Sequence, residues 1–204
     1  MIKRFLFQKV LEAGIQEGFQ PGKSEESRAW FRAQASKLNR LRPERIVRSK
    51  AARTNQKTNI WKPGELYLFQ YDALNKETLP YYDRFPLMML VDEYTDGFMG
   101  INFHYLPPLL RAVLMERMYR FLNNNEFDET TRLLLTYRKL KAMAGRPLYK
   151  PCVKRYLNSQ VKSRFIKIHP AEWDLVLMLP LDRFVGKNRG LVWRDSKNIY
   201  EGPK

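Results

Sequence analysis

The stretch LPYYDRFPLMMLVDEYTDGFMGINFHYLPP, residues 79–108, decides the fold, because it holds seven aromatic side chains in 30 residues. Its segments 85–94 and 97–106 are rich in the apolar and aromatic residues that strands favour. The turn-forming residues TDG join the two segments, so we expect a β-hairpin. Gly100, inside the second segment, predicts either a β-bulge or a close approach of the neighbouring backbone.

A third strand is expected in the preceding segment WKPGELYLFQYDA, residues 61–73. After a Pro-Gly turn, Leu66 and Leu68 alternate with Tyr67 and Phe69, so both faces of this strand carry large apolar side chains. Three bent strands with short links predict a small antiparallel SH3-like sheet or barrel.

A helical hairpin should follow the sheet, formed by residues 107–122 and 127–145. The first helix is apolar around much of its circumference, so it should be buried. Its expected core positions are Leu110, Val113, Leu114, Met118 and Phe121. The second helix has acids in its first turn, an apolar stripe, and glycine and proline as stop signals.

The C-terminal third predicts a strand-helix unit. In RFIKIHP, Phe165 and Lys167 share one face of a strand, and Ile166 and Ile168 share the other. PAEWDLVLML then begins a helix with a proline and early acids. The fold class is therefore α+β.

The charge of the chain is concentrated at its two ends. The 204 residues have a formal net charge of +16. Residues 1–60 hold 14 Lys and Arg against 5 Asp and Glu, residues 61–145 hold 10 against 11, and residues 146–204 hold 13 against 5. Such an excess favours contact with a polyanion, either nucleic acid or an acidic protein. We therefore expect a basic helical arm and linker in residues 1–60 and a compact core with a basic C-terminal region in residues 61–204.

The arm should begin with a helix that starts after Ser24 and ends before Pro43. Beyond Pro43 the chain is basic with few apolar anchors, so it should be disordered when the protein is alone. A solvated linker and an arm lying along phosphates or on an acidic neighbour both fit this composition. The candidate residues for binding nucleic acid or an acidic partner are Arg28, Arg32, Arg40, Arg45, Arg48, Lys50, Arg53, Lys154, Arg155, Lys162, Arg164 and Lys167.

Residues that could carry catalysis are few. His104 and His169 are the only histidines and have no metal-binding spacing, so we interpret them as a structural and a turn histidine. The paired acids Asp92-Glu93 and Asp128-Glu129 could hold Mg²⁺, but the second pair suits a helix N-terminus equally well. The sequence contains no Walker A, GxGxxG or GxSxG motif. It therefore predicts a protein that is not an enzyme, with no cofactor, no metal and no small-molecule substrate.

The sequence also predicts the environment of four other side chains. Cys152 is the single cysteine, which excludes an internal disulfide, and it should be a small buried hydrophobe. Asp83 should act as a local cap or pair with an arginine. Tyr81 and Tyr82 are the aromatics of the opening stretch that we expect to be exposed, where they could form a protein interface. The apolar runs are too short for a membrane span, so no membrane partner is expected.

Two blocks of this sequence resemble a known family. They are WKPGELYLFQYDALNKETLPYYDRFPLMMLVDEYTDGFMGINFHYLPPLLR and YKPCVKRYLNSQVKSRFIKIHPAEWDLVLMLPLDRF, and with the hairpin between them they cover about residues 61–185. They resemble DNA end protector-like virion proteins of T-even-like tailed bacteriophages, particularly those of marine and cyanobacterial hosts. The most specific motifs are LPYYDRFPL, GINFHYL and PCVKxYL.

The resemblance implies a virion protein, made in the host cytoplasm, that shields the ends of packaged double-stranded DNA at the head–neck region among other virion proteins. A tail, neck or baseplate structural protein fits the composition equally well. Its basic arms would bind acidic neighbouring subunits without contacting DNA. Charge alone does not separate the two functions.

Overall fold

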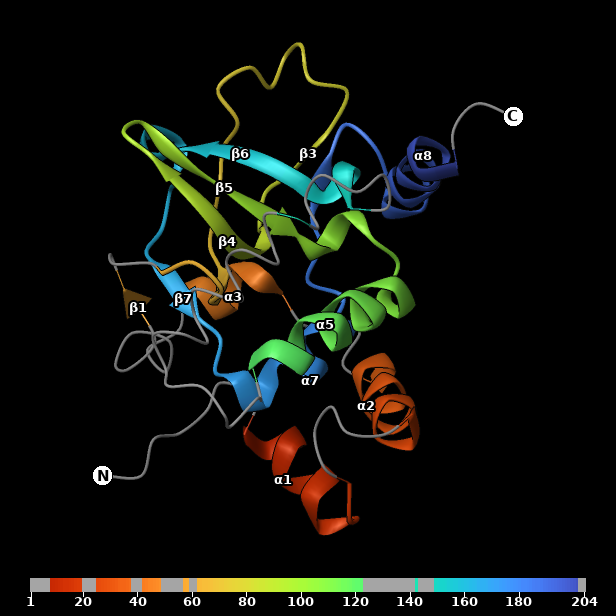
Figure 1. Ribbon diagram of the computed structural model, residues 1–204. Helices are drawn as coiled ribbons and strands as arrows, with labels where there is room; N and C mark the ends of the chain where they lie inside the picture. Colours follow the sequence, from red (N-terminus) through yellow and green to blue (C-terminus); the bar gives the residue numbers. More distant parts are fainter. Residues whose placement is uncertain are drawn as a thin grey trace.

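A computed structural model of the chain describes residues 8–19, 25–37, 42–48, 57–58, 62–122, 142 and 149–201. Its centre is a six-stranded antiparallel sheet in the order β1-β7-β2-β4-β5-β6 (Figure 1). The strands are β1 (Lys57–Thr58), β2 (Leu66–Leu68), β4 (Leu87–Tyr94), β5 (Gly97–Asn102), β6 (Val153–Leu157) and β7 (Phe165–Lys167). A second sheet pairs β3 (Tyr82–Asp83) with β8 (Phe184–Val185).

The hairpin expected in the opening stretch is confirmed as β4 and β5. Tyr94 pairs with Gly97, which leaves a two-residue turn between the strands. Gly100 sits where the backbone of the neighbouring strand comes close, because a Cβ built there would lie 2.7 Å from the Met89 carbonyl oxygen. The β-bulge lies on the facing strand, between Leu90 and Asp92. The predicted close approach is therefore correct, and the irregularity belongs to β4.

The sheet separates two cores, as the alternation in residues 61–73 predicted. Leu66 and Leu68 join a large cluster on the helical side, and Tyr67 and Phe69 join an aromatic cluster on the other side. The same division is confirmed for β7, where Ile166 and Ile168 face the helices and Phe165 faces the aromatic cluster. Large apolar side chains on both faces of one strand require cover on both sides of the sheet.

The sheet is strongly curled around the aromatic cluster. Strands β7 and β5 are three places apart, which is about 14 Å in a flat sheet. The rings of Phe165 on β7 and Phe98 on β5 nevertheless have centroids 5.5 Å apart. Strands β6 and β1 remain at the two edges, so the described strands form no closed barrel. The antiparallel sheet is confirmed, whereas the barrel alternative is not and the SH3-like arrangement is not established.

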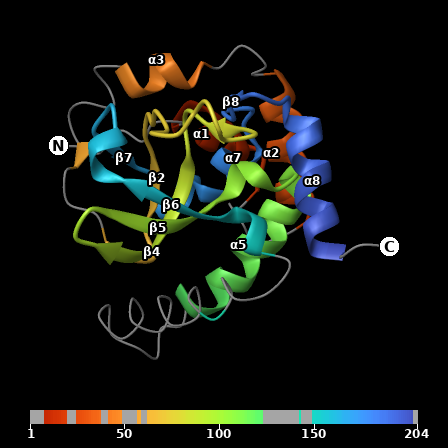
Figure 2. The same ribbon diagram turned by 90° about the horizontal axis from the view of Figure 1, so that it is seen from above.

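Helices cover the other face of the sheet (Figures 1 and 2). They are α1 (Gln8–Gln16), α2 (Glu25–Lys37), α3 (Pro43–Arg48), α5 (Pro108–Leu122), α7 (Trp173–Met178) and α8 (Arg189–Glu201). Helix α7 contacts both α2 and α5, and it is buried along its whole length. Short 3-10 helices occur at Phe103–Tyr105, Lys150–Cys152, Asn158–Gln160 and Pro170–Glu172.

Several expectations about the helices need correction. Residues 103–105, expected as strand, form a 3-10 helix that Asn102 caps, because its side-chain oxygen accepts from the His104 N–H at 3.0 Å. Val113 is exposed rather than buried, because it lies on the outer face of α5 with Leu109. The second helix of the predicted hairpin, residues 127–145, falls outside the described residues except for position 142.

The N-terminal segment is also attached more firmly than its composition suggested. Helix α2 packs on α7, and β1 pairs with β7. Ile46 and Val47 of α3 are 8% and 3% exposed and belong to the main core. The expectation of disorder beyond Pro43 is therefore wrong for Pro43–Arg48, since two apolar side chains anchor that turn of helix. The division of the chain at residue 60 stays a prediction.

Candidate nucleic-acid interface

Two exposed cations predicted to bind a polyanion, Lys162 and Arg164, lie on the connection between β6 and β7, residues 158–164. Backbone hydrogen bonds fix this connection to the segment after β2: the Lys162 N–H donates to the Gln70 carbonyl at 2.8 Å, and the Asp72 N–H donates to the Gln160 carbonyl at 3.1 Å. Tyr71 and Val161 form an isolated bridge between the same two segments. Side chains on the connection therefore project from a well-supported backbone.

Lys162 and Arg164 are the two predicted cations that this connection leaves most accessible. Both are exposed, and neither forms an ion pair with any carboxylate in the described part of the chain. The Lys162 ammonium donates only to the Ser159 carbonyl, at 3.3 Å. Because neither cation forms an ion pair within the described residues, both can meet the phosphates of a nucleic acid without first breaking one.

The other three predicted cations of this region already have partners within the protein. Arg155 pairs with Asp96 and lies 4.5 Å from the centre of the Tyr94 ring. Lys167 pairs with Glu65. Lys154 is half-buried, with its ammonium 4.1 Å from the centre of the Tyr105 ring, and burial lowers its pKa. Because of these contacts, fewer positive charges are available to a ligand than the number of basic residues in this region suggests.

The N-terminal candidates are distributed differently. Arg45 and Arg48 are exposed on α3. Arg28 and Arg32 lie in α2, but their side chains are not described; Arg40, Lys50 and Arg53 fall outside the described residues.

Tyr81 and Tyr82 are less accessible than expected. Tyr82 is 9% exposed because β3 pairs with β8, and its hydroxyl donates to Asp72 at 3.1 Å. Tyr81 is half-buried, with its ring against those of Tyr105 and Phe184. The expected exposure is therefore corrected, and a role for the two tyrosines in a protein interface stays a prediction.

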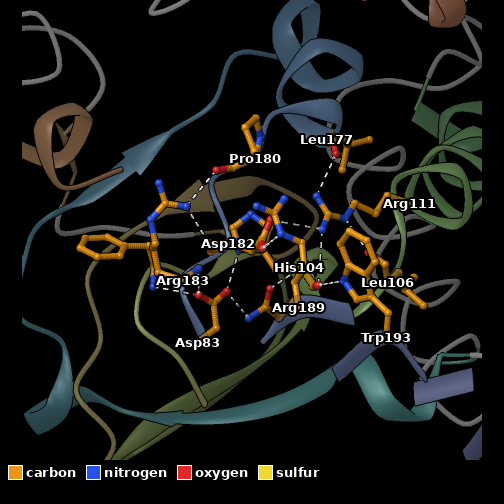
Figure 3. A network of polar contacts seen from close by, with 12 residues as sticks. Asp83, His104, Leu106, Arg111, Leu177, Pro180, Asp182, Arg183, Arg189 and Trp193 are labelled. Carbon is orange, nitrogen blue, oxygen red and sulfur yellow. Dashed lines mark hydrogen bonds and ion pairs between the residues drawn. The ribbon is translucent and has the colours of Figure 1, made fainter. Parts of the chain in front are cut away.

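A buried polar network, which the sequence did not reveal, holds the middle of the fold together (Figure 3). Asp83 is 2% exposed and lies at its centre. One carboxylate oxygen accepts from the N–H groups of Phe85 at 3.1 Å and Arg183 at 3.2 Å. The other accepts from the Asn102 amide at 3.2 Å and lies 2.7 Å from Nδ1 of His104. The expected local cap is confirmed by the Phe85 N–H, two residues further on, whereas the long-range contacts with Asn102, His104 and the Arg183 N–H were not predicted.

Electrostatics within the network favour the ionised form of Asp83. Burial by itself would raise the pKa of this carboxyl, but the His104 imidazole and the three donated hydrogen bonds lower it below its ordinary value. His104 is fully buried, as a structural histidine should be, and its Nε2 has no hydrogen-bond partner among the described residues. With no exposed surface, the pair cannot reach a substrate and acts as a structural tie.

Arg111 forms the second half of this network. Its guanidinium donates to the carbonyls of Leu106 at 2.7 Å and Leu177 at 3.0 Å, and it lies 3.8 Å from Asp182. Burial lowers its pKa to about 10, so the side chain remains charged at neutral pH. The arginine joins α5 to the end of α7. Sequence reasoning missed it because two of these partners, Leu177 and Asp182, lie far away along the chain.

The remaining candidates for chemistry have structural roles. Nδ1 of His169 accepts from the Ala171 N–H at 3.2 Å and caps a 3-10 turn, which confirms the expected turn role. Cys152 is fully buried, as predicted, and burial raises the pKa of its thiol to about 12. Asp128 and Glu129 lie outside the described residues. Over the ranges that the structure describes, no three His, Cys, Asp or Glu side chains group as a metal site would require.

Taken together, the curled sheet, the buried polar network and the exposed cations define a basic α+β protein. The family model of the Phage T4 terminal DNA protecting protein matches residues 22–199 of this chain. The chain therefore belongs to that bacteriophage family, which confirms the resemblance drawn from its motifs. The match also begins well before residue 61, so it includes most of the N-terminal segment.

Two further comparisons found nothing. No curated protein and no solved structure matches the chain.

Among the described helices, none has the length and apolar character needed to cross a bilayer.

Proposed function

We propose that this protein is a non-enzymatic virion protein that binds and shields the ends of the packaged linear DNA at the head–neck region of the particle. The family match over residues 22–199 carries the proposal, because proteins of this family are described as protecting terminal DNA. Synthesis in the host cytoplasm and contact with other virion proteins belong to the same proposal.

The distribution of charge supports contact with phosphates. A net charge of +16 is far larger than solubility requires. Two exposed cations of the C-terminal third, Lys162 and Arg164, lie on one fixed connection. Phosphate contacts of this kind carry no sequence information and weaken steeply as salt rises. An end-binding protein needs the first property, since it must accept whatever sequence the terminus has.

The test compares DNA forms at equal concentration. A gel-shift titration with one blunt linear duplex and the same sequence as a closed circle, over a range of salt, should show tighter binding to the linear form. The bound linear duplex should also resist an exonuclease. Equal binding to both forms at moderate salt would exclude end binding. It would favour the alternative of a tail, neck or baseplate protein that binds acidic neighbours.

Substitution of the two accessible cations sharpens the test. The double variant Lys162→Gln and Arg164→Gln should weaken binding and lower the slope of log affinity against log salt by roughly two. The matched control is Arg194→Gln with Lys197→Gln, which removes the same charge from exposed positions on α8, on the other side of the fold (Figures 1 and 2). Equal losses in both double variants would show that net charge, rather than this connection, governs binding.

A further inference from the structure

A second group of arginines surrounds a hollow that none of the preceding contacts uses. The hollow has a volume of about 430 Å³ and is lined by Arg42, Glu44, Arg45 and Arg183. This volume lies toward the lower end of the range for small-ligand pockets. Three guanidinium groups and one carboxylate leave its wall with a net charge of +2. A wall of that composition selects an anion.

The two arginines contributed by the N-terminal segment are held by α3, which lies at the periphery of the fold (Figure 2). The Arg45 N–H donates to the Arg42 carbonyl at 2.9 Å, which fixes the first turn. Pro43, Ile46 and Val47 bury the inner face of the helix. The side chains of Arg42 and Arg45 remain exposed. The buried face of α3 thus fixes the helix, and the charged side chains of Arg42 and Arg45 extend from it into solvent.

The third arginine is positioned from the opposite end of the sequence. The Arg183 N–H donates to Asp83, and its carbonyl accepts from the Arg84 N–H at 2.9 Å. Its Nη1 donates to the carbonyls of Pro180 at 3.0 Å and Asp182 at 2.7 Å (Figure 3). These bonds hold the guanidinium in one orientation, so little side-chain entropy is lost when an anion binds.

Arginine in this number suits a terminal phosphate better than an internal one. The planar guanidinium fork pairs with two oxygens at once, which is why arginine recurs at phosphate sites. A phosphate at the end of a strand has three oxygens free to accept, whereas a phosphate within a strand has two. Three guanidinium groups around one small hollow therefore match the chemistry of a strand end.

We propose that the hollow between α3 and Arg183 binds the terminal phosphate of a DNA strand. This inference rests on the proposed function and adds to it the chemical group by which an end is distinguished from the interior of a duplex. Arg42 and Arg45 supply exposed charge, and Arg183 supplies a positioned one. Glu44 moderates the affinity through its negative charge.

The experiment measures binding of the full chain to one short blunt duplex by fluorescence anisotropy. The duplex is made with 5′-phosphate, with 3′-phosphate or with hydroxyl groups at all ends. A phosphorylated form should bind roughly tenfold more tightly than the hydroxyl form, as expected for a hydrogen-bonded charge pair. Inorganic phosphate should abolish this preference while leaving the hydroxyl-ended duplex bound. Equal affinity for all three duplexes would overturn the inference.

Variants identify the hollow as the site. The double variant Arg42→Gln and Arg45→Gln should lose the preference for phosphorylated ends, whereas the control Arg48→Gln, on the same helix but outside the hollow, should keep it. Glu44→Gln should instead tighten binding of phosphorylated ends, a gain that a folding defect cannot produce. A preference that survives the double variant would place the phosphate elsewhere and refute the proposal.

The terminal-phosphate site and the proposed function can be refuted independently. If linear and circular DNA bind equally well, end binding itself is wrong. If linear DNA binds more tightly but end phosphorylation has no effect, only the terminal-phosphate site is wrong.

Discussion

Replacing Asp83 by asparagine, a side chain of nearly the same size, should strongly destabilise the fold. The carboxylate is 2% exposed and receives three hydrogen bonds, from the N–H groups of Phe85 and Arg183 and from the Asn102 amide. His104 contacts it at 2.7 Å. Asparagine has nearly the same shape, so the substitution removes the charge and one acceptor without opening a cavity.

The magnitude follows from this geometry. The asparagine amide has one oxygen, which can accept from the groups on only one side of the side chain. Its NH₂ group must then face the groups on the other side, which lose their acceptor. Each buried donor left without an acceptor costs about 1–3 kcal/mol. Two such groups, together with the weakened contact to His104, give about 3–5 kcal/mol. Typical domains have about 5–15 kcal/mol of stability in total.

Urea unfolding followed by circular dichroism would measure this loss, and thermal unfolding should show a decrease in Tm of roughly 10 °C. Asp96→Asn is the matched control, because Asp96 pairs with Arg155 at the surface and both side chains are about half exposed. The control should lose less than about 1 kcal/mol. A loss below about 1 kcal/mol for Asp83→Asn would show that the network does not hold the fold together.

Three more outcomes test other parts of the structure. The pKa of Asp83 is lowered from 3.8, so its stabilisation is present above that pH and is lost as the pH falls through the pKa of the folded state. In urea titrations, the difference in free energy of unfolding between the unmodified protein and Asp83→Asn should therefore be smaller at pH 3 than at pH 7. Gly97→Ala should lower the free energy of unfolding by at least about 2 kcal/mol, because its Cβ would lie 2.0 Å from the Tyr156 carbonyl oxygen. The control Gly190→Ala in α8 should leave stability unchanged, and equal melting temperatures of the two variants would contradict this reasoning. Cys152, with a pKa raised to about 12, should react with a thiol reagent at pH 8 only after unfolding, and a rapid reaction of the native protein would show that it is accessible.

The strands were predictable because their signal is local. Side chains in a strand point alternately to the two faces, so the pattern around Leu66–Leu68 and Phe165–Lys167 already assigns each residue to one of the two cores. Helix α3 has a weaker signal: Ile46 and Val47 are two apolar residues in a basic segment, and only their packing shows that they anchor it.

The polar network could not be predicted in the same way. Asp83 and His104 are 21 positions apart, and Arg111 reaches the Leu177 carbonyl 66 positions away. A lone aspartate between a tyrosine and an arginine has the local composition of a turn. Its role depends on donors brought together from the residue before β8, from β5 and from the segment beyond β3, and no local pattern contains that information.

The same distinction applies to the binding surface. The sequence by itself determined how much positive charge each third of the chain carries, because charge is a sum over residues and does not depend on their positions. Only the tertiary structure decided which cations remain available. Folding pairs Arg155 with Asp96, 59 positions away, and Lys167 with Glu65, 102 positions away, and it gathers Arg42, Arg45 and Arg183 around one hollow. Attraction between charges depends on distance in space, which the chain acquires only when it folds.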